Sequence, residues 1–271
     1  MLQELAQWPV DNVAGALIGP GGVTETFGDT ARAFALASVT KPLVASAVLV
    51  AVEEGAVELD TLAGPPGATV AHLLAHASGL AFDSREQIAA VGTQRIYSSA
   101  GFEVLAETVE RATGIAFADY LNEAVAEPLG MSTTTLDGPA GHGATSCVDD
   151  LARYAQDLLV PRIVSPETAR SAHSVWFPGL DGFVPGYGRH RPCDWGLGFE
   201  IRGQKSPHWT APSASPETFG HFGQSGTFLW VDPVRRAACV VLTDRAFGAW
   251  AKPLWSEFNE RVCTELDNPV G

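Results

Sequence analysis

The segment from Leu43 to Glu54 is apolar on nearly every side of the helix that its composition favours. Gly55 follows it directly, and glycine is a common residue just beyond the end of a helix. A helix without a polar face has to lie inside the protein, because any exposed side would place apolar surface in water. The rest of the chain must therefore surround this helix.

Extended segments are predicted at both ends of the chain. Apolar and β-branched runs flanking glycine-containing turns are typical of β-hairpins. The predicted strands are residues 13–18, 23–27, a short candidate at 33–37, a short strand near 195–201, and a second hairpin at 226–232 and 237–242. A closing helix is expected at 254–266.

The middle of the chain has helical periodicity instead. Helices are predicted at 72–76, 100–113, 117–125 and 148–159. Residues 177–216 are rich in Gly, Pro and aromatic side chains, and a long irregular connection of this kind often borders a binding site. We predict one α+β domain, an α/β sandwich whose antiparallel sheet comes from both chain ends. Its sheet lobe spans about 1–60 and 195–271, and a mostly helical lobe, about 61–194, is inserted between them.

Charge and composition exclude several functions. The 271 residues carry a net charge of −14, so the surface should repel nucleic acids and anionic lipids. The longest mainly apolar run, 43–52, is too short for a membrane span, and the N-terminus lacks the pattern of a secretory signal. We therefore expect a cytoplasmic protein, a monomer or weak homo-oligomer. The four cysteines, at 147, 193, 239 and 263, include no Cys-x-x-Cys pair, so we expect buried free thiols and neither metal nor cofactor.

Ser38 and Lys41 stand three positions apart in front of the buried helix. On a helix this spacing places a hydroxyl and an amine on one face. The amine of a lysine that is removed from water has a lowered pKa and can take the proton of a serine hydroxyl. Only three of the 17 basic residues are lysines, which makes a chance occurrence of this pair less frequent. The pattern indicates a nucleophilic serine with a lysine base.

With these residues the chain resembles the serine β-lactamase and penicillin-binding-protein superfamily, especially its class C β-lactamase, D-alanyl-D-alanine carboxypeptidase and family VIII esterase branches. The resemblance extends over most of the chain, in the order that the superfamily shows. It rests on Ser38-Val39-Thr40-Lys41, Leu73–Leu80, Tyr97-Ser98-Ser99, Pro128–Met131, Asp149–Arg153, Trp195–Gly198 and Gly220–Gly223.

The resemblance implies a catalytic role for four side chains. Ser38 corresponds to the acylated nucleophile and Lys41 to its partner. Tyr97 corresponds to a second base, its phenol pushed toward phenolate by the Lys41 ammonium. His221 stands where a lysine or histidine usually begins the tripeptide of the strand that lines the cleft.

Further residues correspond to binding positions. Ser99 takes the polar place after Tyr97, and Phe222 and Gly223 complete the tripeptide beside the substrate. The backbone N–H groups of Ser38 and Gln224 correspond to the oxyanion hole.

Two departures from the superfamily pattern bear on the substrate. Phe222 replaces a hydroxyl residue that helps to hold a substrate carboxylate, and His221 replaces a permanently charged lysine. Both changes favour a small neutral ester or amide over a penicillin-like acid. The prediction is therefore an esterase-like serine hydrolase. The alternatives are a β-lactamase or D-alanyl-D-alanine carboxypeptidase, and a binding or sensor protein that keeps the fold without turnover.

Other hydrolase classes fit less well. The tetrapeptide Gly223–Gly226 imitates the sequence around a trypsin-like serine, but the helical middle of the chain contradicts a pair of β-barrels. No Gly-x-Ser-x-Gly elbow is present. His72 and His76 share a helix face, yet Leu73 fills the place of the zinc-peptidase glutamate, so we expect packing or supporting roles for His76.

Overall fold

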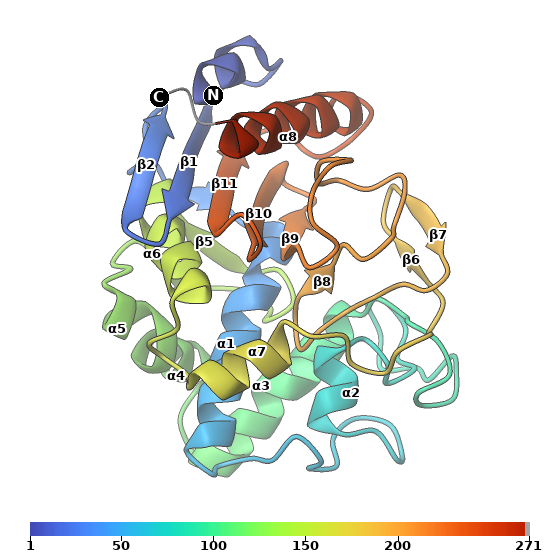
Figure 1. The fold of residues 1–271 in the computed structure, drawn as a ribbon. Helices are drawn as coiled ribbons and strands as arrows, with labels where there is room; N and C mark the ends of the chain where they lie inside the picture. Colours follow the sequence, from blue (N-terminus) through green and yellow to red (C-terminus); the bar gives the residue numbers. More distant parts are fainter. Residues whose placement is uncertain (269–271) are drawn as a thin grey trace.

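The computed structural model describes residues 1–268, and its centre is a six-stranded sheet (Figure 1). The strand order is β2-β1-β11-β10-β9-β8, and every neighbouring pair is antiparallel. The strands are β1 (Val13–Gly19), β2 (Gly22–Phe27), β8 (Glu200–Ile201), β9 (Phe219–Gly223), β10 (Thr227–Asp232) and β11 (Ala237–Thr243). The predicted α+β architecture, with one antiparallel sheet from both chain ends, is confirmed.

The two faces of the sheet are covered by different helices. Side chains alternate along each strand. In β11, Ala238, Val240 and Leu242 belong to the core on one face, while Cys239 and Val241 belong to the core on the other. Helix α6 (Val148–Leu159) packs against the first face, and α8 (Ala251–Asp267) covers the second. Although α6 has its predicted bounds, it packs on β1 and β11, not in the helical lobe.

Helix α1 (Thr40–Glu53) is buried along most of its length, as its sequence predicts. It packs against α3 and α4 and also contacts β9 of the sheet. The remaining helical elements are η1 (Leu2–Gln7), η2 (Ala37–Val39), α2 (Val70–Leu74), α3 (Ser99–Thr113), α4 (Phe117–Leu121), the π-helical turn η3 (Asn122–Ala126), α5 (Glu127–Leu129) and α7 (Pro166–Ala172). Helix α1 therefore lies between α3 and α4 and the main sheet.

Two small sheets complete the fold. One has the order β3-β5-β4, with β3 at Phe34–Ala35, β4 at Thr135–Leu136 and β5 at Ala144–Ser146. The predicted strand at 33–37 is thus β3, but it pairs with β5 and does not join the main sheet. The other is a hairpin of β6 (Gly182–Val184) and β7 (Gly188–His190) within the aromatic-rich connection. Strands β4 to β7 and helix α7 were not predicted from the sequence.

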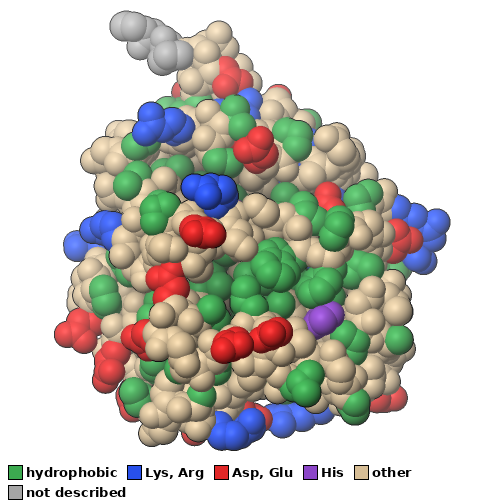
Figure 2. Space-filling view, turned by 60° about the horizontal axis from the view of Figure 1, so that its bottom comes forward, with side chains coloured by type: hydrophobic (Ala, Val, Ile, Leu, Met, Phe, Trp, Pro, Cys, Tyr) green, Lys and Arg blue, Asp and Glu red, His purple; other side chains and the backbone are tan. Residues whose placement is uncertain are grey.

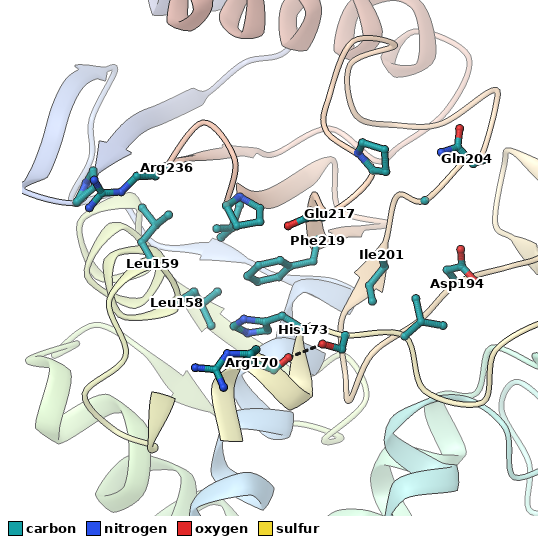
Figure 3. Close-up of a pocket in the computed structure, with 17 residues that line it drawn as sticks. Leu158, Leu159, Arg170, His173, Asp194, Ile201, Gln204, Glu217, Phe219 and Arg236 are labelled. Atoms are coloured by element: carbon teal, nitrogen blue, oxygen red, sulfur yellow. Dashed lines mark hydrogen bonds between the residues drawn. The ribbon is translucent and has the colours of Figure 1, made fainter. Parts of the chain in front are cut away.

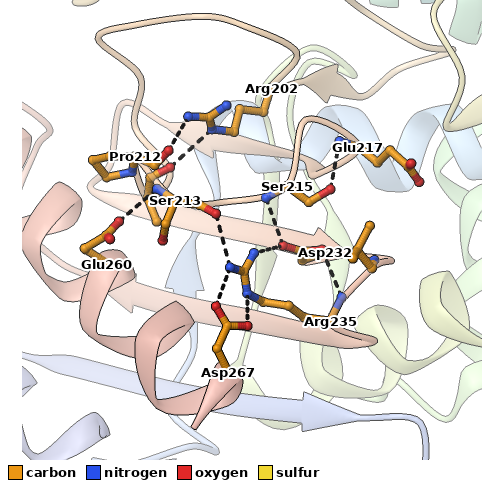
Figure 4. Close-up of polar contacts among 11 residues, drawn as sticks. Arg202, Pro212, Ser213, Ser215, Glu217, Asp232, Arg235, Glu260 and Asp267 are labelled. Carbon is orange, nitrogen blue, oxygen red and sulfur yellow. Dashed lines mark hydrogen bonds and ion pairs between the residues drawn. The ribbon is translucent and has the colours of Figure 1, made fainter.

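Arg235, in the turn after β10, ties that turn to the end of α8 (Figure 4). Its guanidinium lies 2.7 Å from Asp232 Oδ2 and 2.7 Å from Asp267 Oδ2, and it also donates to the carbonyl oxygen of Ser213 at 3.1 Å. Because Asp232 is completely buried, this pairing satisfies a charge that would be costly alone. Arg235 therefore holds α8 against its face of the sheet.

Three further features concern the surface, the helices and the cysteines. Hydrophobic side chains gather in the middle of the face in Figure 2, with acidic side chains beside them. None of the helices within residues 1–268 combines the length and apolar character needed to cross a membrane. All four cysteines are free and buried, as predicted.

Candidate active site

Ser38 lies in the short 3₁₀ turn η2, directly before α1. The preceding residue, Ala37, has φ = 47°, a left-handed conformation that is uncommon for a residue with a side chain and marks a constrained turn. Strand β9 runs close beside it, because a Cβ at Gly223 would come within 2.3 Å of the Leu36 carbonyl oxygen. Thr227 Oγ1 donates to the same oxygen at 2.9 Å. The half-buried Ser38 is therefore held against the edge of β9.

Lys41 extends from the first turn of α1 into a closed polar niche. Its Nζ lies 3.4 Å from Ser38 Oγ, 3.1 Å from Ser99 Oγ and 2.7 Å from the carbonyl oxygen of Gly141. The side chain is fully buried. An ammonium has three protons and these are three acceptors, whereas a neutral amine keeps a lone pair that can face one hydroxyl. The predicted Ser38–Lys41 pair is present in the structure.

Burial lowers the pKa of Lys41 to about 7, and Glu103 acts in the opposite direction with a smaller effect. Desolvation disfavours the charged ammonium, which is the usual cause of such a shift. Near neutral pH the neutral and charged forms are then present in comparable amounts. The amine can accept a proton from Ser38 and later return it.

The loop that bears Gly141 is a part of the site that the sequence analysis missed. Glu103, on α3, accepts hydrogen bonds from the N–H groups of Ala140 at 3.1 Å and Gly141 at 2.8 Å. A Cβ at Gly141 would lie 2.8 Å from Cβ of Ser99, so a larger residue does not fit without a shift. Glu103 and the small residue together place the carbonyl that accepts from Lys41. Glu103 lies four residues after Ser99, one turn along the same helix face, but Gly141 had no comparable signal.

The aromatic ring of Tyr97 packs against the Lys41 amine. Its ring centroid is 4.5 Å from Lys41 Nζ, and its hydroxyl oxygen is 3.4 Å from His221 Nε2. Burial raises the pKa of Tyr97, while its contact with the Ser38 hydroxyl acts in the opposite direction. The expectation that Lys41 pushes this phenol toward phenolate was wrong, since desolvation disfavours the anion and dominates. Tyr97 is a protonated phenol within reach of Ser38.

His76 supports the segment that carries Tyr97. Its Nδ1 accepts a hydrogen bond from the N–H of Ser98 at 3.1 Å, and its ring packs 4.6 Å from Tyr97 and 4.6 Å from Trp195. Ser98 caps α3 by accepting from the N–H of Gly101 at 3.0 Å. The supporting role expected for His76 fits this arrangement.

His221 is buried and faces Tyr97 from β9. Burial lowers its pKa to about 3, and Lys41 acts in the same direction, so the ring is neutral at pH 7. Nδ1 lies 2.7 Å from the carbonyl oxygen of Phe222, which can only accept, so Nδ1 carries the proton. Nε2 is then an acceptor for the hydrogen bond that the Tyr97 hydroxyl donates. His221 therefore orients that hydroxyl and adds no positive charge to the site.

Phe222 lies on the opposite face of β9. Its ring packs 5.0 Å from Phe247, 5.9 Å from Tyr187 and 5.9 Å from Trp255, and the residue is only 6% exposed. The expectation that Phe222 lines the substrate cleft is not met, because successive side chains in a strand point to opposite faces and His221 already faces inward.

Gln224 follows β9 at the position assigned to the oxyanion hole. Its carbonyl oxygen accepts from Phe247 N–H at 2.8 Å, and its side chain donates to the Phe247 carbonyl oxygen at 3.1 Å. Within residues 1–268 its own N–H has no hydrogen-bond acceptor. A free N–H on an anchored backbone is what an oxyanion hole requires.

A cavity of about 480 Å³ adjoins Tyr97. Its apolar lining includes Phe82, Ile88, Ile96 and Phe183, and Phe183 belongs to the aromatic-rich connection that was expected to border a binding site. Trp195 and Trp209 of the same connection are buried in the core instead. In the part of the chain that the structure describes, no three His, Cys, Asp or Glu side chains are grouped to hold a metal ion.

The fold and the site together define a class: a serine hydrolase scaffold in which a lysine amine and a phenol flank a serine. A model of the family described as Beta-lactamase matches residues 29–259. The chain belongs to this family, within the serine β-lactamase and penicillin-binding-protein superfamily, as predicted.

A related protein and solved structures support this family membership. A crystal structure of a β-lactamase from Mycobacterium bovis is 62% identical, covers 98% of both chains and has a TM-score of 0.97. A Salmonella enteritidis protein named "Putative D-alanyl-D-alanine carboxypeptidase" is 26% identical over 207 residues, 60% of this chain and 48% of the relative. The chain thus spans about half the length of the curated relatives it matches. EstCE1, described as a hydrolase with promiscuous acyltransferase activity, is 17% identical with a TM-score of 0.77 over 95% of both chains, which shows the fold alone.

Proposed function

We propose that this protein is a serine hydrolase that forms an acyl-enzyme on Ser38 and acts on small ester or amide substrates. The observation that carries the proposal is the Lys41 amine, which lies 3.4 Å from Ser38 Oγ and has its pKa lowered to about 7. A serine hydroxyl becomes an effective nucleophile when an adjacent base with a pKa near the working pH takes its proton.

Acylation begins with proton transfer from Ser38 Oγ to neutral Lys41. Ser38 Oγ then bonds to the substrate carbonyl carbon, and the N–H groups of Ser38 and Gln224 stabilise the resulting oxyanion. When the intermediate collapses, the bond to the leaving group breaks and Tyr97 gives that group its proton. The Lys41 ammonium returns a proton to Tyr97. Water then attacks the ester of Ser38 while Lys41 accepts its proton, and Ser38 leaves with that proton as the acid is released.

The substrate preference follows from the charges around this centre. His221 is neutral above about pH 4, since its pKa lies at about 3, so it does not attract a carboxylate. Phe222 is turned into the core, so position 222 offers a substrate carboxylate no hydrogen bond. The cavity beside Tyr97 has apolar lining side chains, and two of its charged lining residues, Asp181 and Arg189, pair with each other. These features favour a neutral substrate with an apolar group, and the esterase-like activity is our first candidate.

A β-lactamase or D-alanyl-D-alanine carboxypeptidase activity is the second candidate. It is favoured by the Mycobacterium bovis relative, which is described as a β-lactamase at 62% identity, and by the name of the Salmonella relative. The same acyl-enzyme chemistry serves a lactam or a peptide, so the two candidates differ in substrate and not in mechanism.

Turnover of three substrates separates these candidates. We expect kcat/KM for p-nitrophenyl butyrate to exceed that for nitrocefin and for a D-Ala-D-Ala peptide, and Ser38→Ala to abolish release of nitrophenol. Efficient nitrocefin hydrolysis would establish the second candidate. Absence of turnover with all three, and of any acyl adduct on Ser38, would instead identify a binding or sensor protein.

A further inference from the structure

A second and larger cavity, of about 770 Å³, lies between α6, α7 and strands β8, β9 and β10 (Figure 3). Ser38, Lys41 and Tyr97 are not among its lining residues. Its volume falls within the range of small-molecule sites, roughly 300 to 1,000 Å³. The acylation chemistry described above does not use this cavity.

The floor of the cavity is apolar and includes Phe219, Ile201 and Val231. His173 stacks on Phe219 with ring centroids 3.8 Å apart and meets Phe199 edge-on at 4.8 Å. Burial lowers the pKa of His173 to about 3, so the ring is neutral. Neither of its nitrogens has a hydrogen-bond partner within residues 1–268, which leaves one donor and one acceptor for a ligand.

The two ends of the cavity differ in charge. Figure 3 shows Arg170 and Arg236 near Leu158 and Leu159 at one end, while Asp194 and Gln204 lie at the other. The carboxylate of Glu217, which is exposed, lies between them near Phe219, so a ligand's anionic head is favoured only at the arginine end. In the described part of the chain neither arginine forms an ion pair with a carboxylate. Two free guanidinium groups beside an apolar floor complement a molecule with an anionic head and an apolar body.

We propose that this cavity binds a small amphipathic carboxylate, with its apolar body over Phe219 and His173 and its carboxylate at Arg170 and Arg236. The site is separate from the acylation centre but shares a strand with it. Phe219 and His221 are two residues apart on β9, and residues two apart point to the same face of a sheet. A bound acid therefore contacts the strand that orients the Tyr97 hydroxyl.

Isothermal titration calorimetry with three matched probes tests the proposal on the full chain. The probes are 4-phenylbutyrate, the neutral 4-phenylbutanamide and the cationic 4-phenylbutylamine. We expect saturable binding of one 4-phenylbutyrate, about tenfold tighter than the amide, because two exposed guanidinium groups together contribute attraction of that order. The double variant Arg170→Gln, Arg236→Gln should bind the acid no more tightly than the amide.

Two further variants locate the binding site. Val175 is 38% exposed and lines the cavity, so Val175→Trp should fill it from the surface without disturbing the core and should weaken binding of all probes. Arg189 lines the other cavity, beside Tyr97, and Arg189→Gln should leave binding of the acid unchanged. Circular dichroism checks that each variant is folded.

Four outcomes would overturn the proposal: no saturable binding, equal affinity for the acid and the amide, tighter binding of the amine, or loss of acid binding in Arg189→Gln. Because the titration requires no turnover, its failure leaves the proposed hydrolase untouched. Failure of the hydrolase likewise leaves this site untouched.

Discussion

Lys41 Nζ lies 2.7 Å from the carbonyl oxygen of Gly141, its shortest polar contact, although 100 residues separate the two in the chain. This carbonyl accepts one hydrogen bond from the amine, so the remaining N–H groups or lone pair of the amine can face Ser99 and Ser38. The position of the Gly141 loop therefore affects the orientation of the amine.

Gly141→Ala should lower activity without unfolding the protein. The new Cβ would lie 2.8 Å from Cβ of Ser99, so the loop has to move and the carbonyl leaves Lys41. We expect kcat with p-nitrophenyl butyrate to fall about tenfold, the cost of a hydrogen bond to a charged group. Gly21→Ala is the matched control, because its Cβ meets nothing within 4 Å. Equal rates in the two variants would show that the carbonyl is dispensable.

Lys41→Arg should be almost as inactive as Lys41→Ala. A guanidinium keeps its positive charge at any working pH and cannot accept the Ser38 proton. Loss of a base that activates the nucleophile reduces kcat by about 10² to 10⁴. Steady-state rates with p-nitrophenyl butyrate measure this directly. Near-normal turnover in the arginine variant would mean that Lys41 supplies only charge.

The rate of acylation should rise with pH through about 7. The pKa of Lys41 lies at about 7, below its ordinary 10.5, and the reactive form is the neutral amine that predominates above this pH. Below pH 7 we expect kcat/KM to fall about tenfold per unit, with a plateau above. A profile that is flat from pH 5.5 to 8.5 contradicts the role of Lys41 as a base.

The buried amine should also make stability depend on pH. Between about pH 7 and 10.5 the unfolded chain binds a proton at Lys41 that the folded protein does not, so the stability of the wild type rises with pH. Relative to Lys41→Met, which cannot titrate, the free energy of unfolding of the wild type should rise by about 1.4 kcal/mol per pH unit in this interval. Urea unfolding at pH 7, 8 and 9 gives this difference, and a constant difference would place the pKa outside the interval.

Phe222→Thr should destabilise the fold without creating β-lactam hydrolysis. The ring fills the aromatic core beside α8, so its loss should cost about 3 kcal/mol in unfolding free energy. The matched control is Phe183→Thr, which is 62% exposed and should change stability little but raise KM for apolar esters. A gain of nitrocefin turnover in Phe222→Thr would show that the side chain at position 222 does contact the substrate.

The sequence predicts elements whose local pattern is strong. Helix α1 is apolar on nearly every side, the turn between β1 and β2 is rich in glycine, and α6 begins and ends where its pattern does. The missed helix α7 had a signal, since Ser165 caps it and Pro166 begins it. The strands β4 to β7 have only two or three residues each and are defined by their partners, which no local pattern indicates.

Spacing and resemblance predict which residues form the site, but not their protonation or orientation. Ser38, Lys41, Ser99 and Tyr97 come together as expected, and His221 faces Tyr97. The protonation of Tyr97 depends on how completely the fold removes it from water, which the sequence does not reveal. The face of β9 on which the Phe222 side chain lies depends on how β9 pairs with β10, which the sequence does not reveal. Gly141 enters through a loop whose only recognisable property is a small residue.

The most direct test of the central claim is the site of covalent labelling by a fluorophosphonate. Intact mass followed by peptide mapping should show one adduct, on Ser38, formed much more slowly in Lys41→Ala and absent in Ser38→Ala. An adduct on Ser225 or elsewhere, or equal labelling rates with and without the Lys41 amine, would contradict the account of a serine activated by a buried lysine.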